Sequence, residues 1–123
     1  MQEETTQSAA PRVTEKDVRD AIVGEHYFTA RHGFDGAIEV GEYCGSERPQ
    51  YGVDHLAPLD LLTFCVLVLR NGYTVVGTSA CVSPENFDAA IGRKVAREDA
   101  VGKVWPLLGY ALKDRLVQGA ESF

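Results

Sequence analysis

The sequence contains no apolar run long enough to cross a lipid bilayer. Its longest such run, Leu61–Leu69, is interrupted by Thr63 and falls far short of the roughly 20 residues that a membrane-spanning helix needs. Basic residues are also scarce, since 12 lysines and arginines face 18 aspartates and glutamates, for a formal net charge of −6. Binding to nucleic acid depends on cationic side chains that neutralise phosphates. We therefore expect a protein that neither spans a membrane nor binds nucleic acid directly.

Cysteines are few, and their spacing suits neither a disulfide framework nor a metal site. The three of them are Cys44, Cys65 and Cys81. No two lie within a few residues of each other, and no two histidines stand at the usual spacing of zinc ligands. The first residues, Met1–Thr6, are polar and acidic, unlike a secretory signal. We expect no metal, no cofactor, and a location in the reducing cytoplasm.

The composition is that of one folded domain. Apolar residues make up 45% of the 123 residues and charged residues 24%, as in ordinary globular proteins. Residues 1–12 hold no side chain suited to a core, so we predict a flexible tail there. The single domain is expected at 13–123.

The first third of the domain predicts a helix followed by irregular chain. Thr14 is a suitable N-cap, and the apolar positions that follow it predict a helix to about Ala30. Five glycines lie between positions 31 and 60. Their density predicts turns and short extended pieces, for example around Ala37–Tyr43.

The clearest local signal is a β-hairpin. The apolar run Leu61–Leu69 is followed by Asn71-Gly72 and then by the β-forming run Tyr73–Gly77, which predicts a hairpin with a type I′ turn. Because the first run is apolar at nearly every position, it is expected to be buried on both faces. A hairpin alone is marginally stable, so a third strand from the glycine-rich segment or a second copy of the chain should complete the sheet. An apolar strand with an unpaired edge favours a homodimer.

The last third predicts helix. Ser83–Asn86 has the composition of a helix start, and the helix should continue to about Val104. Pro106 should kink or end it near Trp105, before a second helical segment to about Val117. The expected fold is α+β. An N-terminal helix precedes a central antiparallel β-hairpin, which can extend to a three-stranded sheet, and a kinked C-terminal helical pair packs on that sheet.

The main helix carries the candidate binding residues. At the helical period one face combines apolar side chains with a charged pair, and its members are Phe87, Ile91, Lys94, Glu98, Val101 and Trp105. One explanation is an ion pair at the edge of the domain, with the lysine stem covering apolar surface. The other is a ligand or partner site lined by Lys94, Arg97 and Glu98, with Trp105 as an aromatic anchor.

Two further features have a functional and an ordinary explanation. Arg93 and Arg97 form a small basic face that can receive a phosphate-bearing ligand, although such residues more often form a solvated surface. Cys81 precedes a predicted helix start, where a thiol can become nucleophilic, but a small packed residue explains it as well. Cys65 is expected to be plain packing in the apolar strand.

Several strings of residues match a known family literally. They are Glu25–Thr29, Leu62–Cys65, Asn71–Val75, Ser79–Asp88, Ile91–Glu98, Val104–Leu107 and Gly109–Tyr110. Through them the chain resembles the gp-forty-nine-like family of small proteins from tailed phages and prophages. The resemblance implies a phage or prophage origin and a role inside a bacterial host cell. It implies no mechanism and no site residues.

Three functional hypotheses follow. Small size, acidity and the lack of a recognisable catalytic group favour a phage accessory protein that binds a host protein, to inhibit a defence system or redirect host machinery. The alternative is a small-molecule binder that sequesters nucleotides through Arg93, Lys94 and Arg97. The third is an enzyme that uses Cys81 with a histidine brought close to it by the fold.

Overall fold

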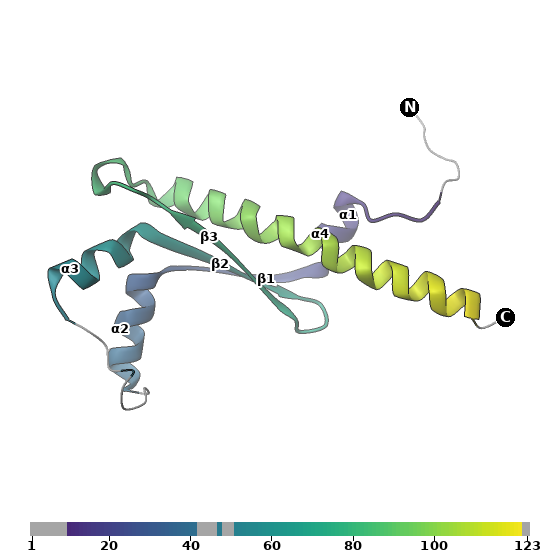
Figure 1. The fold of residues 1–123 in the computed structure, drawn as a ribbon, viewed down its shortest axis with the longest axis horizontal. Coiled ribbons are helices and arrows are strands. Elements are labelled where there is room, and N and C mark those ends of the chain that lie inside the picture. The colour runs from purple at the N-terminus through teal and green to yellow at the C-terminus, as the bar shows by residue number, and fades with distance from the viewer. Residues whose placement is uncertain (1–9, 42–46, 48–50, 122–123) are drawn as a thin grey trace.

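The computed structural model describes residues 10–41, 47 and 51–121 (Figure 1). The elements are α1 (Glu15–Ala21), β1 (Ile22–Thr29), α2 (Ala30–Val40), α3 (Val53–Leu56), η2 (Ala57–Leu61), β2 (Leu62–Leu69), β3 (Thr74–Ala80), η3 (Pro84–Asn86) and α4 (Ala89–Glu121), where η denotes a 3-10 helix. Most of the predicted tail, as well as Cys44, lies outside the described residues.

The three strands form one antiparallel sheet in the order β1-β2-β3, which confirms the α+β fold. The strand expected to have an unpaired edge, β2, is therefore central. Its second partner, β1, comes from the segment that was predicted to be helical. The start of that helix is confirmed, because Thr14 and Asp17 form a capping box at α1, but α1 ends at Ala21. β-branched and aromatic residues follow, and their pairing along β2 outweighs a weak helical pattern.

The glycine-rich segment is more regular than its composition predicts. The short extended piece expected around Ala37–Tyr43 is wrong as far as it is described, because α2 continues to Val40. Thr29 caps this helix with its hydroxyl, and Gly41 ends it with a φ of 72°, which is the left-handed region that favours glycine. Local capping thus overcomes the helix-weakening glycines within α2.

The β2–β3 hairpin is confirmed, but its turn differs from the predicted type I′. The Gly72 N–H donates to the Leu69 carbonyl at 2.8 Å, so Arg70 and Asn71 are the central residues of the turn. Gly72 follows them with a φ of 90°, and the Leu69 N–H closes the loop on the Tyr73 carbonyl at 2.8 Å. The hairpin loop therefore has three residues, and Gly72 is the last of them. In the predicted type I′ turn it would have been the second of two central residues.

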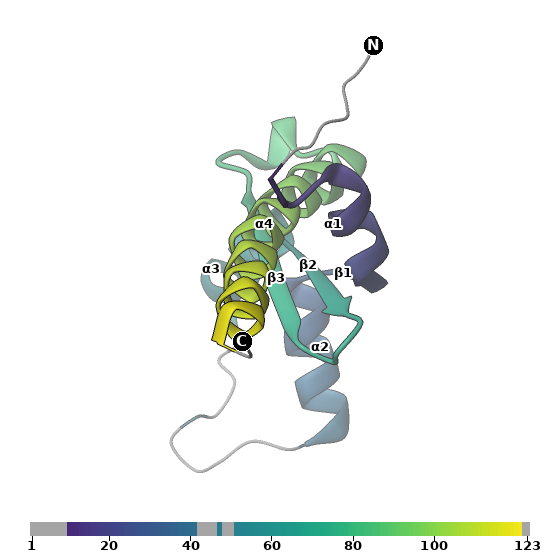
Figure 2. The ribbon, with the colours of Figure 1, turned by 90° about the vertical axis from the view of Figure 1, so that its right-hand side faces the viewer.

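Burial along β2 alternates, so the prediction that both of its faces are buried is wrong. Thr63, Cys65, Leu67 and Leu69 are buried under α4, whereas the residues between them are only half-buried. The packing role expected for Cys65 is confirmed, since it belongs to the core cluster. In both views α1 and α4 lie above the sheet, and α2 extends below one end of it (Figures 1 and 2). One face of the sheet therefore holds the core.

The predicted kinked helical pair is instead one helix, α4, with Pro106 inside it. Core contacts on both sides of the proline, from buried Val104 and half-buried Leu108, keep the two parts in one element. The predicted start at Ser83 is also wrong. Residues 84–86 form η3, and the Asp88 carboxylate accepts from the first amides of α4, at Ala90 and Ile91. None of the described helices is both long and apolar enough to cross a membrane.

The helix α4 approaches β3 very closely at Gly77. A Cβ atom at this position would lie 2.1 Å from the Ala96 carbonyl oxygen and 2.3 Å from the Ala100 nitrogen. Ala96 and Ala100 are fully buried, so small residues on both elements allow the backbones to meet. This contact sets the position of α4 across the sheet.

Side chains of α4 also reach the outer backbone of β3. The Thr78 N–H donates to Asp99 Oδ2 at 2.9 Å, and Lys103 Nζ donates to the Val76 carbonyl oxygen at 2.7 Å. Asp99 and Lys103 are 3.6 Å apart and pair with each other. Backbone groups on the side of β3 that has no neighbouring strand are thereby hydrogen-bonded.

Candidate functional site

The face of the sheet opposite α4 is largely uncovered, and five of the nine side-chain positions on it are apolar. Strand register places the side chains on this face in three rows, which are Gly24–Val68–Thr74, His26–Val66–Val76 and Phe28–Phe64–Thr78. We call these nine residues the open face. It carries no lysine, arginine, aspartate or glutamate, and His26 is its one titratable residue.

Exposure supports this description. Val76 on β3 is 42% exposed and Phe28 on β1 is 38% exposed, and both side chains are apolar. The rings of Phe28 and Phe64 pack at a centroid distance of 5.7 Å. The helix α2 reaches only the end of the face where β1 ends and β2 begins (Figure 1). A contiguous apolar patch of this kind marks an interaction surface more often than isolated exposed residues do.

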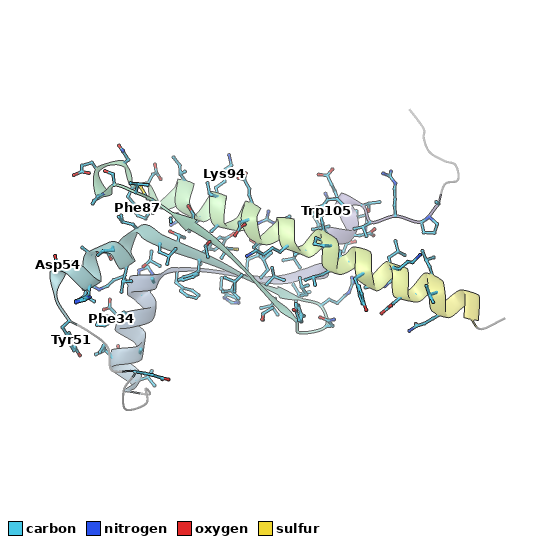
Figure 3. The ribbon with its side chains drawn as sticks, in the orientation of Figure 1. Phe34, Tyr51, Asp54, Phe87, Lys94 and Trp105 are labelled. Carbon is cyan, nitrogen blue, oxygen red and sulfur yellow. The ribbon has the colours of Figure 1, made fainter. Side chains whose placement is uncertain are left out.

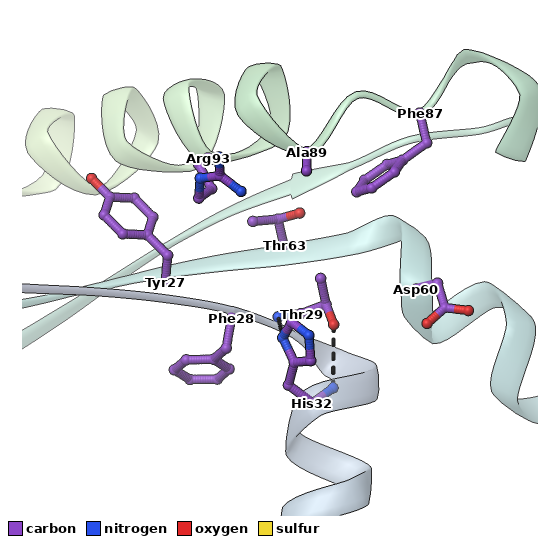
Figure 4. A pocket seen from close by; sticks show the side chains of 9 residues that line it. All are labelled: Tyr27, Phe28, Thr29, His32, Asp60, Thr63, Phe87, Ala89 and Arg93. Atoms are coloured by element: carbon purple, nitrogen blue, oxygen red, sulfur yellow. Dashed lines mark hydrogen bonds between the residues drawn. The ribbon is translucent and has the colours of Figure 1, made fainter.

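A second candidate site is a cleft of about 300 Å³ between the ends of β1 and α4, which we call the end cleft. Five elements contribute to it: the end of β1, the start of α2, η2, the start of β2, and the first two turns of α4. Phe87, which precedes α4, lines it as well. Figure 4 shows Tyr27, Thr63 and Phe87 around its interior, with Arg93 above and His32 below. The cleft therefore exists only where distant parts of the chain meet.

The polar groups in the end cleft include Arg93, His32, Thr63 and Asp60. Arg93 is exposed and makes no hydrogen bond or ion pair with any described residue. His32 accepts the Thr29 N–H on its Nδ1 at 3.0 Å, so the proton of the neutral ring belongs on Nε2. The Thr63 side chain is 2% exposed, and its hydroxyl has no hydrogen-bond partner within the described part of the chain.

Among the predicted site residues, Arg97 is engaged by β1. Its Nε and Nη2 each donate to the Glu25 carboxylate at 3.1 Å, in a two-pronged ion pair. This hydrogen-bonded guanidinium lowers the pKa of Glu25 below its ordinary value. Tyr27 donates to the same carboxylate at 2.9 Å, and burial, followed by that hydrogen bond, raises the pKa of Tyr27 to about 12. Arg97 thus ties α4 to β1.

We expect the Glu25–Arg97 pair to contribute to acid sensitivity. Because the pKa of Glu25 is lowered by folding, the pair stabilises the folded chain above the ordinary glutamate pKa and loses that contribution as pH falls through the lowered value. Glu25→Gln should therefore flatten the fall in the urea midpoint between about pH 5 and pH 3. Both side chains are more than a third exposed, so the effect is modest. Glu98→Gln is the control, and an equal flattening there would contradict the assignment.

Lys94, Glu98 and Trp105 do not form one site. Lys94 points away from the sheet (Figure 3), and the expected Lys94–Glu98 ion pair is absent from the described structure. Trp105 is 38% exposed and lines a hollow of about 260 Å³ against α1, together with Arg97. The stripe of α4 that covers the sheet is Gly92, Ala96, Ala100 and Val104, so the face chosen from the sequence is not the buried one.

Cys81 lies at the end of β3 beside a hollow of about 450 Å³. Its thiol donates to the Ser83 carbonyl at 3.2 Å. The described residues that line this hollow are almost all apolar and include no histidine. The cysteine–histidine arrangement of the third hypothesis is therefore not found beside this hollow.

Sequence reasoning missed both the open face and the end cleft. The β-branched and aromatic residues of Ile22–Thr29 were the available signal for β1, and without β1 neither site can be assembled. Arg93, and Phe87 from the predicted helix face, connect the sequence-based prediction with the end cleft. No group of three or more potential metal ligands occurs among the described residues.

The fold and these surfaces define a small α+β protein in which one long helix covers one face of a three-stranded antiparallel sheet. Residues 13–116 match the model of the phage protein (N4 Gp49/phage Sf6 gene 66) family, and the chain belongs to that family. No curated protein and no solved structure matches it. The match confirms the resemblance found in the sequence strings.

Proposed function

We propose that this phage-family protein acts without catalysis, by binding a host bacterial protein in the cytoplasm through its open face. The observation that carries the proposal is the uncovered apolar surface around Phe64, Val66 and Val76. Burial of apolar surface is the main driving force for association, and it contributes about 25 cal/mol per Å². Aromatic residues at the centre of an interface often supply much of the binding free energy. Inhibition of a host defence protein, or redirection of host machinery, is the type of outcome that such binding produces.

Charge favours a basic host protein over a second copy of this chain. The chain carries a formal net charge of −6, so two copies repel each other at long range, whereas a positively charged partner is attracted. The partner that fits is a protein with an apolar patch inside a basic surround. Its apolar centre would cover Val66, and its basic rim would meet the acidic remainder of this chain.

The test places a charge in the middle of the open face. Val66→Lys should weaken binding to the host protein by about 100-fold, because an unpaired ammonium buried in an apolar interface costs several kcal/mol. The tagged protein is first used to capture its partner from a bacterial lysate. The Kd of the purified pair is then measured by calorimetry, with wild-type and variant chains.

Ile91→Lys is the matched control, because Ile91 is 59% exposed on the outer side of α4 and lies outside the open face. It should leave the Kd unchanged. Val76→Lys repeats the test at a more exposed position if Val66→Lys unfolds. Unchanged binding in the folded open-face variants contradicts the proposal. So does a stable homodimer of the isolated chain that Val66→Lys separates, since the open face would then belong to a second copy.

A further inference from the structure

The end cleft has the features of a small-molecule site that is separate from the core. Its volume of about 300 Å³ lies at the lower end of the range for such sites, which are mostly apolar with a few convergent polar groups. Tyr27 and Phe87 supply aromatic surface from two parts of the chain, β1 and the residues before α4. Aromatic faces in a cleft favour a flat ring, because stacking is worth about 1–3 kcal/mol per base.

The charged groups of the cleft give it two different ends. Arg93 lies near Tyr27 on the α4 side, whereas Asp60 lies at the η2 side, on the far side of Thr63 (Figure 4). Asp60 makes one long ion pair, at 3.9 Å, with Arg31, so its carboxylate keeps acceptor capacity. A ligand that spans the cleft would place an anion at Arg93 and hydrogen-bond donors at Asp60.

Arg93 differs from the arginines that the fold already uses. Arg97 is held by Glu25, and Arg31 is held by Asp35 and Asp60. Arg93 has no such acidic neighbour within ion-pair distance among the described residues, although it borders the cleft. An unpaired guanidinium beside aromatic walls is the arrangement that binds a phosphate group of an aromatic ligand.

Two more groups add hydrogen-bonding capacity. His32 is held in place by its bond from the Thr29 amide, which leaves Nε2 as a donor on the α2 side. Thr63 lies in the wall between Arg93 and Phe87, and its almost fully buried hydroxyl lacks a partner among the residues described. Buried hydroxyls are normally hydrogen-bonded, so an unpartnered one in a cleft wall points to a site that receives a polar group.

We propose that the end cleft binds a nucleoside monophosphate, with the phosphate at Arg93, the base against the aromatic side chains, and sugar or base donors at Asp60. The cleft residues that carry this proposal, Arg93, Tyr27, Phe87 and Asp60, do not belong to the open face. Mononucleotide binding also agrees with the acidic charge of the chain, because one local cation is sufficient for a mononucleotide, whereas a polynucleotide needs many.

The experiment titrates the full chain with adenosine, guanosine, cytidine and uridine 5′-monophosphates, followed by calorimetry and amide chemical shifts. At least one should saturate, with shift changes centred on Thr29, Thr63 and Arg93. Arg93→Gln should weaken that binding by about tenfold or more, since it removes a charge-assisted hydrogen bond. Lys94→Gln removes the same charge from the neighbouring residue on α4, which points away from the sheet, and should leave binding unchanged (Figure 3).

Three results would overturn the proposal. The first is a lack of saturation by all four mononucleotides at millimolar concentration. The second is an equal affinity of wild-type and Arg93→Gln chains. The third is equal affinity for the mononucleotide and one of its two parts. If the nucleoside bound as tightly, the phosphate would be dispensable. If inorganic phosphate bound as tightly, the nucleoside part would be dispensable.

Discussion

Replacing Gly77 by alanine is expected to cost at least about 3 kcal/mol of folding free energy, and to leave much of the protein unfolded. The new Cβ would lie 2.1 Å from the Ala96 carbonyl oxygen and 2.3 Å from the Ala100 nitrogen. Both are backbone atoms of a helix, so no side-chain rotation relieves the clash, and α4 must move off β3. Urea unfolding followed by circular dichroism measures the loss.

Gly102→Ala is the control for this substitution. Gly102 lies in the same helix, but a Cβ there meets nothing within 4 Å. Alanine should therefore raise stability by about 0.5–1 kcal/mol, because it favours helix more than glycine does. An unchanged urea midpoint in Gly77→Ala would contradict the close contact between α4 and β3 at Gly77.

Leu67→Ala is expected to lose about 2–5 kcal/mol of stability, because it leaves a cavity under α4. Leu67 is fully buried in the core and pairs with Val75 across the hairpin. The substitution removes three buried carbon atoms, so their transfer free energy is lost. The atoms that line the new cavity also lose their van der Waals contacts. The free energy of unfolding in urea gives the value.

Leu62→Ala applies the same chemical change to the other face of β2. Leu62 is only half-buried, and it lies on the side of the strand that α4 does not cover. We expect it to lose about 1 kcal/mol, since less apolar area returns to water. Equal losses at the two positions would mean that both faces of the sheet are covered, and would remove the basis for an open face.

Strong local signals made part of this fold predictable. The hairpin runs and the Thr14 cap rest on neighbouring residues, and the structure contains both. The strand β1 was missed because its identity depends on pairing with β2, about 40 residues away, and not on its own propensity. The inward face of α4 was missed for a related reason. Its small residues indicate the buried face only once their neighbours on the sheet are known, which are Gly77 for Ala96 and Ala100, and Thr63 for Gly92.

The candidate sites were harder to predict than the elements. The predicted residues were chosen as neighbours on one helix, but the structure separates them: Arg93 borders the end cleft, Arg97 pairs with Glu25, and Trp105 lies against α1. A face of a sheet is an exposed surface only when no helix or loop packs on it. Whether one does depends on the whole arrangement of elements, which the identity of single residues does not reveal.

The hydrogen bonds from Asp99 and Lys103 to β3 limit how this protein can assemble. An unpaired strand edge is a template on which further chains can polymerise into fibrils. Here the Thr78 amide and the Val76 carbonyl already have partners in α4, so an incoming strand would have to displace both side chains. The chain can therefore present an apolar sheet surface while this edge resists the growth of intermolecular β-structure.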